Sequence, residues 1–283
     1  MIYRCKLVST GRHLASTAEE QNVDIAGYKI IVTGGASGMG AATVRTYVAA
    51  GATVVSMDVS ENAGIAVVEA ANADNADGEG SASFMTVDIS DKASVDLAFD
   101  AAVLKMGGLD AVAHPAAIQR AGDAQSVTVE DWDLMFAVDV RGTMLVNQAA
   151  YRHMAPQKHG SIINFGSISG LRSEPVAPAY SAAKGAVHSW TRTAAGAWGK
   201  DGIRVNAILP AIATPMYDVA IGRLDEAGRT AHFWQNEQSI AMGQQYGDAD
   251  RDLGPVMIFL ASEASRFISG QLLPVDGGQA SVR

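Results

Sequence analysis

The chain has 283 residues, of which 48% are hydrophobic and 18% charged, and its formal net charge is −9 at pH 7. This composition is that of a globular protein, and the acidic balance without a cluster of Lys or Arg argues against nucleic acid as a partner. No apolar run approaches the roughly 18 residues of a membrane-spanning helix, and the single Cys5 cannot form an internal disulfide. We therefore expect a cytoplasmic protein without a membrane partner.

Residues 1–22 are polar and mixed in charge, and they contain no apolar core typical of a secretory signal. A transit peptide is one alternative, because Arg4, Lys6 and Arg12 precede any acidic residue. A start codon assigned too far upstream is another. We favour a flexible N-terminal extension over 1–22, followed by one dinucleotide-binding and catalytic domain over 23–283.

After this extension, short β-branched runs alternate with longer alanine-rich amphipathic stretches. Strands are predicted at 30–32, 53–57, 84–87, 111–113, 161–165, 203–207 and 271–275. Helices are predicted at 38–50, 61–73, 92–105, 130–154, 179–198 and 250–261, and residues 210–247 break the alternation. The pattern predicts the α/β class: a single doubly wound Rossmann-type domain, with a parallel seven-stranded sheet flanked by helices.

A glycine-rich turn joins the first strand to the first helix. Glycines there permit a tight turn and let backbone amides approach a pyrophosphate at the helix N-terminus. The turn residues expected to bind this cofactor are Gly34, Ser37, Gly38, Met39 and Gly40. Asp58 ends the second strand about 20 residues later, where a carboxylate binds an adenine-ribose 2′-hydroxyl and repels a 2′-phosphate. We therefore predict NAD rather than NADP, although Asp58 could instead cap the following turn.

Further candidates for the cofactor site follow other strands. Ligands of open α/β sheets lie beyond the carboxyl ends of the strands. Asp88 and Ile89 follow the third strand and Ala116 follows the fourth, so we expect all three at the same edge of the sheet. Asp88 could touch the adenine or merely cap the next helix, and we favour the contact.

The candidate catalytic residues lie around the fifth strand and the helix that follows. Tyr180 and Lys184 are four residues apart, so they share one face of that helix. An ammonium about 5 Å from a phenol favours the phenolate by about 3 kcal/mol, or roughly two pKa units. Tyr180 can then act as an acid/base near neutral pH, with Lys184 also binding the nicotinamide ribose. Ser167, just after strand 161–165, can hold the substrate oxygen.

At this point the chain resembles the short-chain dehydrogenase/reductase superfamily, from about Asp24 to Gly278. No single segment is decisive, but the ordered set is specific. The matching segments are Asp24-Ile25-Ala26-Gly27, Thr33 to Gly40, Leu109-Asp110-Ala111-Val112, Gly160-Ser161-Ile162-Ile163-Asn164, Ser167, Tyr180 to Lys184, Gly202-Ile203-Arg204-Val205-Asn206 and Val275-Asp276-Gly277-Gly278.

The resemblance implies an NAD-dependent oxidoreductase that interconverts a secondary alcohol and a ketone by hydride transfer. Tyr180 would be the acid/base, Lys184 its partner and Ser167 the substrate-orienting hydroxyl. Thr214 matches the position whose hydroxyl helps to hold the nicotinamide carboxamide. No metal is expected. A homotetramer or homodimer is expected, with one interface from helices 130–154 and 179–198 and another from the C-terminal strand.

Three positions depart from the family pattern. The usual Asn-Asn-Ala-Gly is here His114-Pro115-Ala116-Ala117, and Ala211 replaces the glycine usual after Pro210. The asparagine that usually completes the catalytic group is Asp139, which cannot donate a hydrogen bond and can carry charge. We interpret these departures as tuning, with Asp139 kept as a catalytic residue and His114 as a structural one.

Substrate identity is expected to depend on the irregular segment, which the resemblance makes a substrate-covering lid over 211–247. Its apolar side chains favour a fairly apolar secondary alcohol or ketone. The residues predicted to contact substrate are Ser167, Ser169, Tyr180, Met216 and Tyr217. Two alternatives stay open: a sugar or ring-diol dehydrogenase of the same family, and an NAD-binding scaffold or sensor with weak catalysis.

Overall fold

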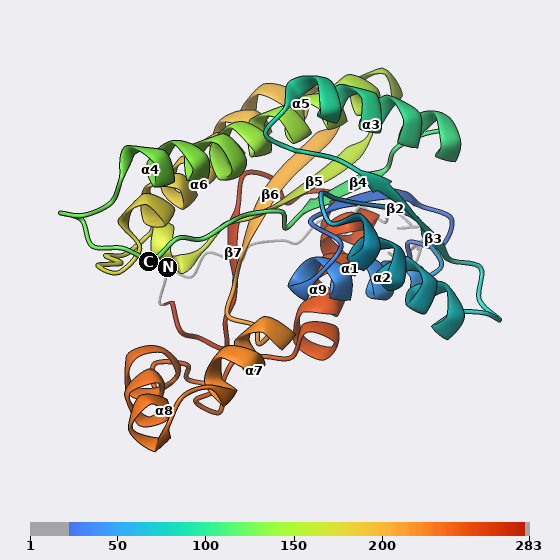
Figure 1. Cartoon of the computed structure of the whole chain (residues 1–283). Helices are drawn as coiled ribbons and strands as arrows, with labels where there is room; N and C mark the ends of the chain where they lie inside the picture. Colours follow the sequence, from blue (N-terminus) through green and yellow to red (C-terminus); the bar gives the residue numbers. More distant parts are fainter. Residues whose placement is uncertain (1–22, 281–283) are drawn as a thin grey trace, which may run out of the picture.

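The computed structural model describes residues 23–280, apart from the side chains of Met216 and Ala220. The extension predicted at 1–22 lies outside these residues. Within them, seven parallel strands form one sheet in the order β3-β2-β1-β4-β5-β6-β7 (Figure 1). The strands are β1 (Lys29–Thr33), β2 (Thr53–Asp58), β3 (Ser81–Thr86), β4 (Ala111–His114), β5 (Gly160–Phe165), β6 (Ile203–Pro210) and β7 (Leu272–Val275). The predicted seven-stranded parallel sheet is thus confirmed.

Helices cover both faces of this sheet, as Figure 1 shows. The α-helices are α1 (Gly38–Ala49), α2 (Glu61–Asp74), α3 (Lys92–Met106), α4 (Val129–Met135), α5 (Thr143–Met154), α6 (Pro178–Trp198), α7 (Pro215–Gly222), α8 (Glu226–His232) and α9 (Gly254–Ala261). One apolar core lies between the sheet and α3, α5 and α6, and a second lies between the sheet and α1, α2 and α9. Because both faces are buried, residues 30–32 of β1 and 111–113 of β4 are continuous apolar runs rather than alternating ones.

The order of the strands reverses between β1 and β4, which are hydrogen-bonded neighbours. The chain runs outward from β1 through β2 to β3, and then crosses back to β4. At such a switch point the loops after the two strands diverge to opposite faces and leave a crevice at the carboxyl edge of the sheet. By this rule a ligand is expected beside the glycine turn after β1 and the loop after β4.

Several elements differ from the predicted ones: β6 continues to Pro210, and the helix predicted at 250–261 is a π-turn over Ala249–Leu253 followed by α9. Two further differences concern β3 and the helix predicted at 130–154. Strand β3 begins at Ser81 rather than residue 84, because the polar residues before Phe84 pair with β2 at the edge of the sheet and need no apolar pattern. The helix predicted over 130–154 is present from Val129 to Met154, but residues 136–142 form a π-helical turn, η1 (Phe136–Gly142). Asp139 lies within this turn.

The segment predicted as a lid leaves the sheet and returns to it. Ile212 forms a bridge with Gly247, and the Ala213 N–H donates to the Gly247 carbonyl at 2.8 Å. Between these tied ends lie α7, α8 and the π-turn η5 (Phe233–Glu237). In Figure 1, α7 and α8 lie apart from the two helical layers, below the sheet.

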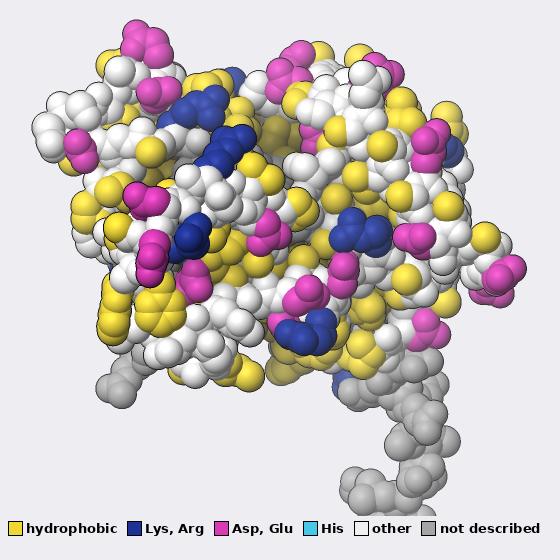
Figure 2. All heavy atoms as spheres, turned by 60° about the horizontal axis from the view of Figure 1, so that its bottom comes forward, with side chains coloured by type: hydrophobic (Ala, Val, Ile, Leu, Met, Phe, Trp, Pro, Cys, Tyr) yellow, Lys and Arg dark blue, Asp and Glu magenta, His cyan; other side chains and the backbone are white. Residues whose placement is uncertain are grey.

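The remaining short turns connect the larger elements. They are η2 (Ala155–Gln157), η3 (Ile168–Gly170), η4 (Gly199–Asp201), η6 (Ala249–Leu253) and η7 (Glu263–Ser265). Acidic and basic side chains are interspersed over the face shown in Figure 2 and do not gather into a basic patch there. Across residues 23–280, every helix is too short or too polar to span a bilayer.

Candidate active site

The glycine turn after β1 is shaped by close backbone contacts. A Cβ on Gly34 would lie 2.6 Å from the Ala116 Cα, and a Cβ on Gly40 would lie 1.9 Å from the Gly34 carbonyl oxygen. Gly34 and Gly38 also have positive φ angles, of 67° and 54°, which favour glycine. The Ser37 side chain makes no capping hydrogen bond to α1. The first amides of α1 therefore keep hydrogen-bonding capacity for an anion, which fits a pyrophosphate.

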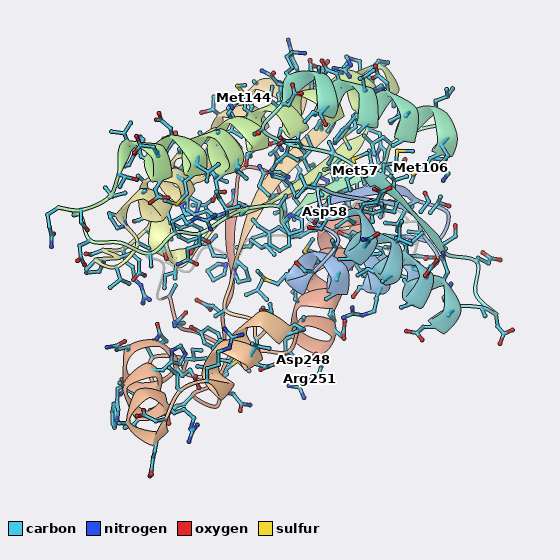
Figure 3. The ribbon with its side chains drawn as sticks, in the orientation of Figure 1. Met57, Asp58, Met106, Met144, Asp248 and Arg251 are labelled. Atoms are coloured by element: carbon cyan, nitrogen blue, oxygen red, sulfur yellow. The ribbon has the colours of Figure 1, made fainter. Side chains whose placement is uncertain are left out.

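Asp58 ends β2 beside this turn. Its Oδ2 accepts the Ala36 N–H at 3.2 Å, and its Oδ1 accepts the Ser60 N–H at 3.0 Å. Figure 3 shows Asp58 in the middle of the molecule, close to α1. A carboxylate has about four lone-pair sites, so two amide bonds leave capacity for a ribose hydroxyl. The turn-capping role and the proposed cofactor contact are thus compatible.

The two candidates after β3 serve different purposes. Asp88 Oδ1 accepts hydrogen bonds from the N–H and hydroxyl of Ser90, at 2.9 and 2.7 Å. The helix α3 is capped by Asp91, which accepts the Ala93 N–H, so the alternative of Asp88 as the cap was wrong. The Ile89 side chain is buried in the core, and its contact with a cofactor stays a prediction.

Thr214, the candidate from the start of the lid, lies against the glycine turn. A Cβ on Gly38 would be 3.7 Å from Thr214 Cγ2. The Thr214 hydroxyl accepts the Tyr217 N–H at 3.3 Å, which caps the first turn of α7. The structure thus brings the start of the segment predicted as a lid against the glycine turn.

The helix α6 brings Tyr180 and Lys184 together below the loop that carries Ser167. Lys184 Nζ lies 5.4 Å from the centroid of the Tyr180 ring and donates to the Phe165 carbonyl at 3.0 Å. The Lys184 side chain is 4% exposed, whereas Tyr180 and Ser167 are partly exposed. A buried cation beside a partly exposed phenol can stabilise negative charge that develops on the phenol oxygen.

Asp139 connects the π-turn to this cation. Its Oδ1 accepts the Ile118 N–H at 2.8 Å, and its Oδ2 lies 3.8 Å from Lys184 Nζ. Oδ2 is buried and has no hydrogen-bond partner among the described residues. Burial raises the pKa of the Asp139 carboxyl, and the Lys184 cation and the Ile118 amide oppose that rise. The departure from asparagine thus places a titratable group against the candidate catalytic lysine.

His114 is held between two threonines. Its Nδ1 lies 2.6 Å from the Thr33 hydroxyl, and its Nε2 lies 3.1 Å from the Thr143 hydroxyl. The Thr143 hydroxyl donates its proton to the Asp139 carbonyl, so Nε2 must be the donor to Thr143 and Nδ1 the acceptor from Thr33. Burial lowers the pKa of His114 to about 3, with a smaller effect from Lys184. This neutral imidazole braces β1, β4 and α5, as the structural reading predicted.

The two alanines that replace family glycines cause no backbone strain. The non-glycine residues with positive φ among those described are Lys158 and Gln244. Ala117 is exposed, and Ala211 continues β6 by donating its N–H to the Val275 carbonyl at 2.9 Å. Neither methyl group therefore requires the loop backbone to change.

On the substrate side, the predicted contacts carry hydrogen bonds of their own. The Ser169 hydroxyl donates to Glu174 at 3.3 Å. The Tyr217 hydroxyl donates to Glu237, and the Tyr217 ring packs edge-on against Tyr246 with centroids 4.9 Å apart. Burial and Glu237 raise the pKa of Tyr217. The side chain of the remaining candidate, Met216, lies outside the described residues.

His188, which contacts the serine loop, was not among the residues predicted from the sequence. His188 Nε2 accepts the Ser167 N–H at 3.3 Å. His188 is four residues after Lys184 and eight after Tyr180, so helical spacing could have placed it on the same face of α6. Glu174 and Glu237 were also missed, because each bonds a residue of another element, Ser169 in η3 and Tyr217 in α7, at no helical or strand spacing.

Comparison with known proteins places this site in a family. The family model described as "Enoyl-(Acyl carrier protein) reductase" matches residues 34–280. Momilactone A synthase from Oryza sativa subsp. japonica is 36% identical over 91% of this chain and 92% of its own length. Cis-4-hydroxycyclohexanecarboxylate dehydrogenase from Sinomonas cyclohexanicum is 35% identical over 89% of this chain and 96% of its own.

The fold also matches that of a solved structure over most of the chain. The crystal structure of levodione reductase superposes with a TM-score of 0.83 at 30% identity, covering 91% of this chain and 99% of that one. It shares the whole architecture, because a match of this extent includes the sheet and both helical layers. The chain belongs to the short-chain dehydrogenase/reductase superfamily, and it is an oxidoreductase acting on CH–OH groups.

Proposed function

We propose that the protein is an NAD-dependent dehydrogenase that oxidises a secondary alcohol to a ketone, with Tyr180 as acid/base. The observation that carries this proposal is the position of Lys184 Nζ, 5.4 Å from the Tyr180 ring and bonded to the Phe165 carbonyl two residues before Ser167. A phenol, a cation and a hydroxyl thus converge at the sheet edge that carries the glycine turn. Such convergence suits the removal of a proton from an alcohol.

The residues of the chain divide the reaction between them. Ser167 holds the alcohol oxygen by a hydrogen bond, and the Tyr180 oxygen takes the hydroxyl proton as the carbonyl double bond forms. A nicotinamide bound at this edge would supply the acceptor for the hydride, which is the hydrogen of the alcohol carbon with its electron pair. Lys184 stabilises the phenolate that exists before proton transfer. In ketone reduction each transfer runs in reverse.

The preference for NAD over NADP is proposed to depend on Asp58. Its carboxylate accepts two backbone N–H groups at the end of β2 and so has a fixed position. A fixed negative charge there repels a 2′-phosphate and accepts a 2′-hydroxyl. Asp58→Ala is expected to weaken NAD binding and to reduce the NAD/NADP ratio of kcat/KM by at least about tenfold. A native protein that already prefers NADP would contradict the assignment.

The proposed substrate class is a fairly apolar secondary alcohol, as the lid composition favours. One relative is a cis-4-hydroxycyclohexanecarboxylate dehydrogenase, and this supports an alcohol on a ring. A ring diol is the second candidate, because the Ser169–Glu174 hydrogen bond places a carboxylate near Ser167, where it could accept a second hydroxyl. Oxidation of a sugar belongs to the same second candidate class as oxidation of a ring diol.

The experiment is to mix the purified protein with NAD or NADP and a panel of alcohols and to follow absorbance of the reduced nicotinamide. Cyclohexanol and cyclohexane-1,2-diol separate the two substrate classes, and galactose tests the sugar alternative. Turnover of one class with NAD supports the proposal. Cofactor binding without turnover of any alcohol or ketone would instead favour the scaffold or sensor alternative.

We also propose that the protein assembles as a homodimer or homotetramer. A groove of about 750 Å³ lies between α4, α5 and α6, and Leu134, Val140, Met144 and Trp190 are among the residues that line it. Leu134 is 43% exposed and Trp132, on the same helix, is 38% exposed. A second copy of the chain would cover this apolar surface. The cytoplasmic location expected from the sequence stays a prediction.

A further inference from the structure

We propose that His188 is a positioning residue, which holds Ser167 in place by accepting its backbone N–H. The inference rests on the proposed function, in which Ser167 orients the substrate oxygen. His188 itself does not face the substrate side of the loop, because its Nε2 points at the backbone of Ser167. Its effect on the reaction would therefore act through Ser167.

The hydrogen bond requires one form of the imidazole. The Ser167 N–H lies 3.3 Å from Nε2, so Nε2 must be unprotonated and the ring proton must reside on Nδ1. His188 is 2% exposed, and burial together with the Lys184 and Arg192 cations lowers its pKa to about 4. At neutral pH the ring is therefore an uncharged acceptor. Without this acceptor the part-buried Ser167 N–H would lose its hydrogen-bond partner in the loop.

Two glycines let the serine loop close around the imidazole. A Cβ on Gly166 would lie 2.5 Å from His188 Nε2, and a Cβ on Gly170 would lie 2.7 Å from His188 Cε1. Neither glycine has a positive φ angle, so glycine is needed here to leave room for the imidazole and not to allow a left-handed backbone. The loop from Gly166 to Gly170 thus takes its shape from the ring beneath it.

The same helix anchors the loop at two neighbouring points. Lys184 donates to the Phe165 carbonyl at 3.0 Å, and His188, one turn later on α6, accepts the Ser167 N–H. Because Tyr180 is on this helix as well, both anchors fix the serine relative to the phenol. Within the loop, the Ser167 hydroxyl accepts the Ser169 N–H at 3.1 Å. Without the His188 hydrogen bond, the end of the loop that carries the Ser167 hydroxyl would be free to move.

The first experiment compares three variants at positions on α6. His188→Leu removes the acceptor, whereas His188→Gln retains an amide oxygen near the place of Nε2. Ser189→Ala, at an exposed neighbour, is the control. Because a displacement of about 1 Å in an active site can cost about 100-fold in rate, we expect His188→Leu to lower kcat by about 10- to 100-fold. His188→Gln is expected to recover most of it, with NAD affinity unchanged in all three.

A double-mutant cycle separates positioning from general stability. If His188 acts through the serine hydroxyl, His188→Leu should cost less than about twofold in kcat when added to Ser167→Ala. Multiplicative losses in the double variant, or equal losses for His188→Leu and His188→Gln, would overturn the proposal.

Amide hydrogen exchange tests the hydrogen bond without activity. The peptide that contains Ser167 should exchange at least about tenfold faster in His188→Leu than in the native protein, and at the native rate in His188→Gln and Ser189→Ala. Unchanged exchange in His188→Leu would overturn the inference even if the enzyme proved inactive on every alcohol. Turnover that is absent in the native protein, with the exchange result as expected, would instead count against the proposed function alone.

Discussion

At the scale of single residues, the Tyr180 hydroxyl is the group on which the proposed chemistry depends most. Tyr180→Phe removes one oxygen and leaves the ring over Lys184. We expect kcat to fall by about 100- to 10,000-fold, the usual contribution of a positioned acid/base, while the Kd for NAD stays nearly unchanged. Steady-state kinetics and equilibrium cofactor titration measure the two quantities. Tyr151→Phe, whose hydroxyl instead bonds Asp201, is the matched control, and substantial activity of Tyr180→Phe would show that the proton acceptor is another group.

Asp139 supplies the second prediction at this scale. Its carboxylate lies 3.8 Å from the Lys184 ammonium and opposes part of the positive charge near Tyr180. A negative charge there disfavours the ionised phenol, so Asp139→Asn should move the midpoint of the pH profile of kcat/KM for alcohol oxidation to lower pH. Coulomb's law at an effective dielectric near 20 makes the shift on the order of one unit.

The asparagine variant also keeps the structural role of this side chain. Its amide oxygen can still accept the Ile118 N–H that now bonds Asp139 Oδ1. Asp123→Asn, at an exposed loop residue, controls for the change in net charge. A midpoint that stays in place, or that moves to higher pH, would show that Asp139 is not charged against Lys184 in the active enzyme.

At the scale of elements, the strands and helices were largely predictable because apolar periodicity follows local burial. The runs 30–32 and 161–165 are buried on both faces and form β1 and β5. The start of β3 was not predictable, because its pairing with β2 at the edge of the sheet buries few side chains. The π-turn at 136–142 was not predicted, because one extra residue per turn leaves the apolar pattern of a long helix almost unchanged.

The site was predictable to the extent that it depends on short motifs. The helical spacing of Tyr180 and Lys184 brought the two side chains together as expected. The bond between His188 and Ser167 could not be read from spacing alone, because it joins α6 to a loop 21 residues earlier. The same holds for Tyr217 and Glu237, which meet only when the lid folds.

The brace formed by His114 gives an element-scale prediction about pH. Its pKa is about 3 in the folded protein, against 6.5 for a free side chain. Below pH 6.5 the His114 side chain binds a proton in the unfolded chain but not in the folded chain. The stability that the neutral imidazole contributes is therefore present above pH 6.5 and is lost as the pH falls toward about 3. This contribution of His114 to the free energy of unfolding is on the order of a few kcal/mol.

His114→Asn removes this titration while leaving a side chain that can hydrogen-bond Thr33 or Thr143. We expect the variant's free energy of unfolding to fall less steeply between pH 6.5 and about 4 than that of the native protein. Urea unfolding at a series of pH values measures both slopes. The difference between the two free energies of unfolding at neutral pH separately measures the packing that the substitution removes. Equal slopes in the two proteins would mean that the buried imidazole is not the group that titrates. A residual slope is expected in the variant, because His188 has a pKa of about 4.

At the scale of the whole molecule, the active site and the proposed interface share their helices. Asp139 lies on the π-turn and contacts Lys184, whereas Val140, the next residue, lines the groove together with residues of α6. Figure 3 shows Met144 on the helical layer, away from Asp58 at the end of β2. Covering the groove would therefore hold α4 and α6 against each other without blocking the crevice at the sheet edge.

This arrangement leads to the prediction that assembly supports activity. Leu134 lines the groove and is 43% exposed, so Leu134→Arg should be tolerated by an isolated chain but should put a charge inside a dimer interface. We expect the molar mass in light scattering after gel filtration to fall by half or more, and kcat to fall with it as the π-turn loses its support. Leu104→Arg adds the same charge at a leucine of α3 that is 85% exposed, outside the groove, and should change neither quantity. An unchanged mass for Leu134→Arg would place the interface elsewhere, whereas a halved mass with full activity would show that each chain completes its own site.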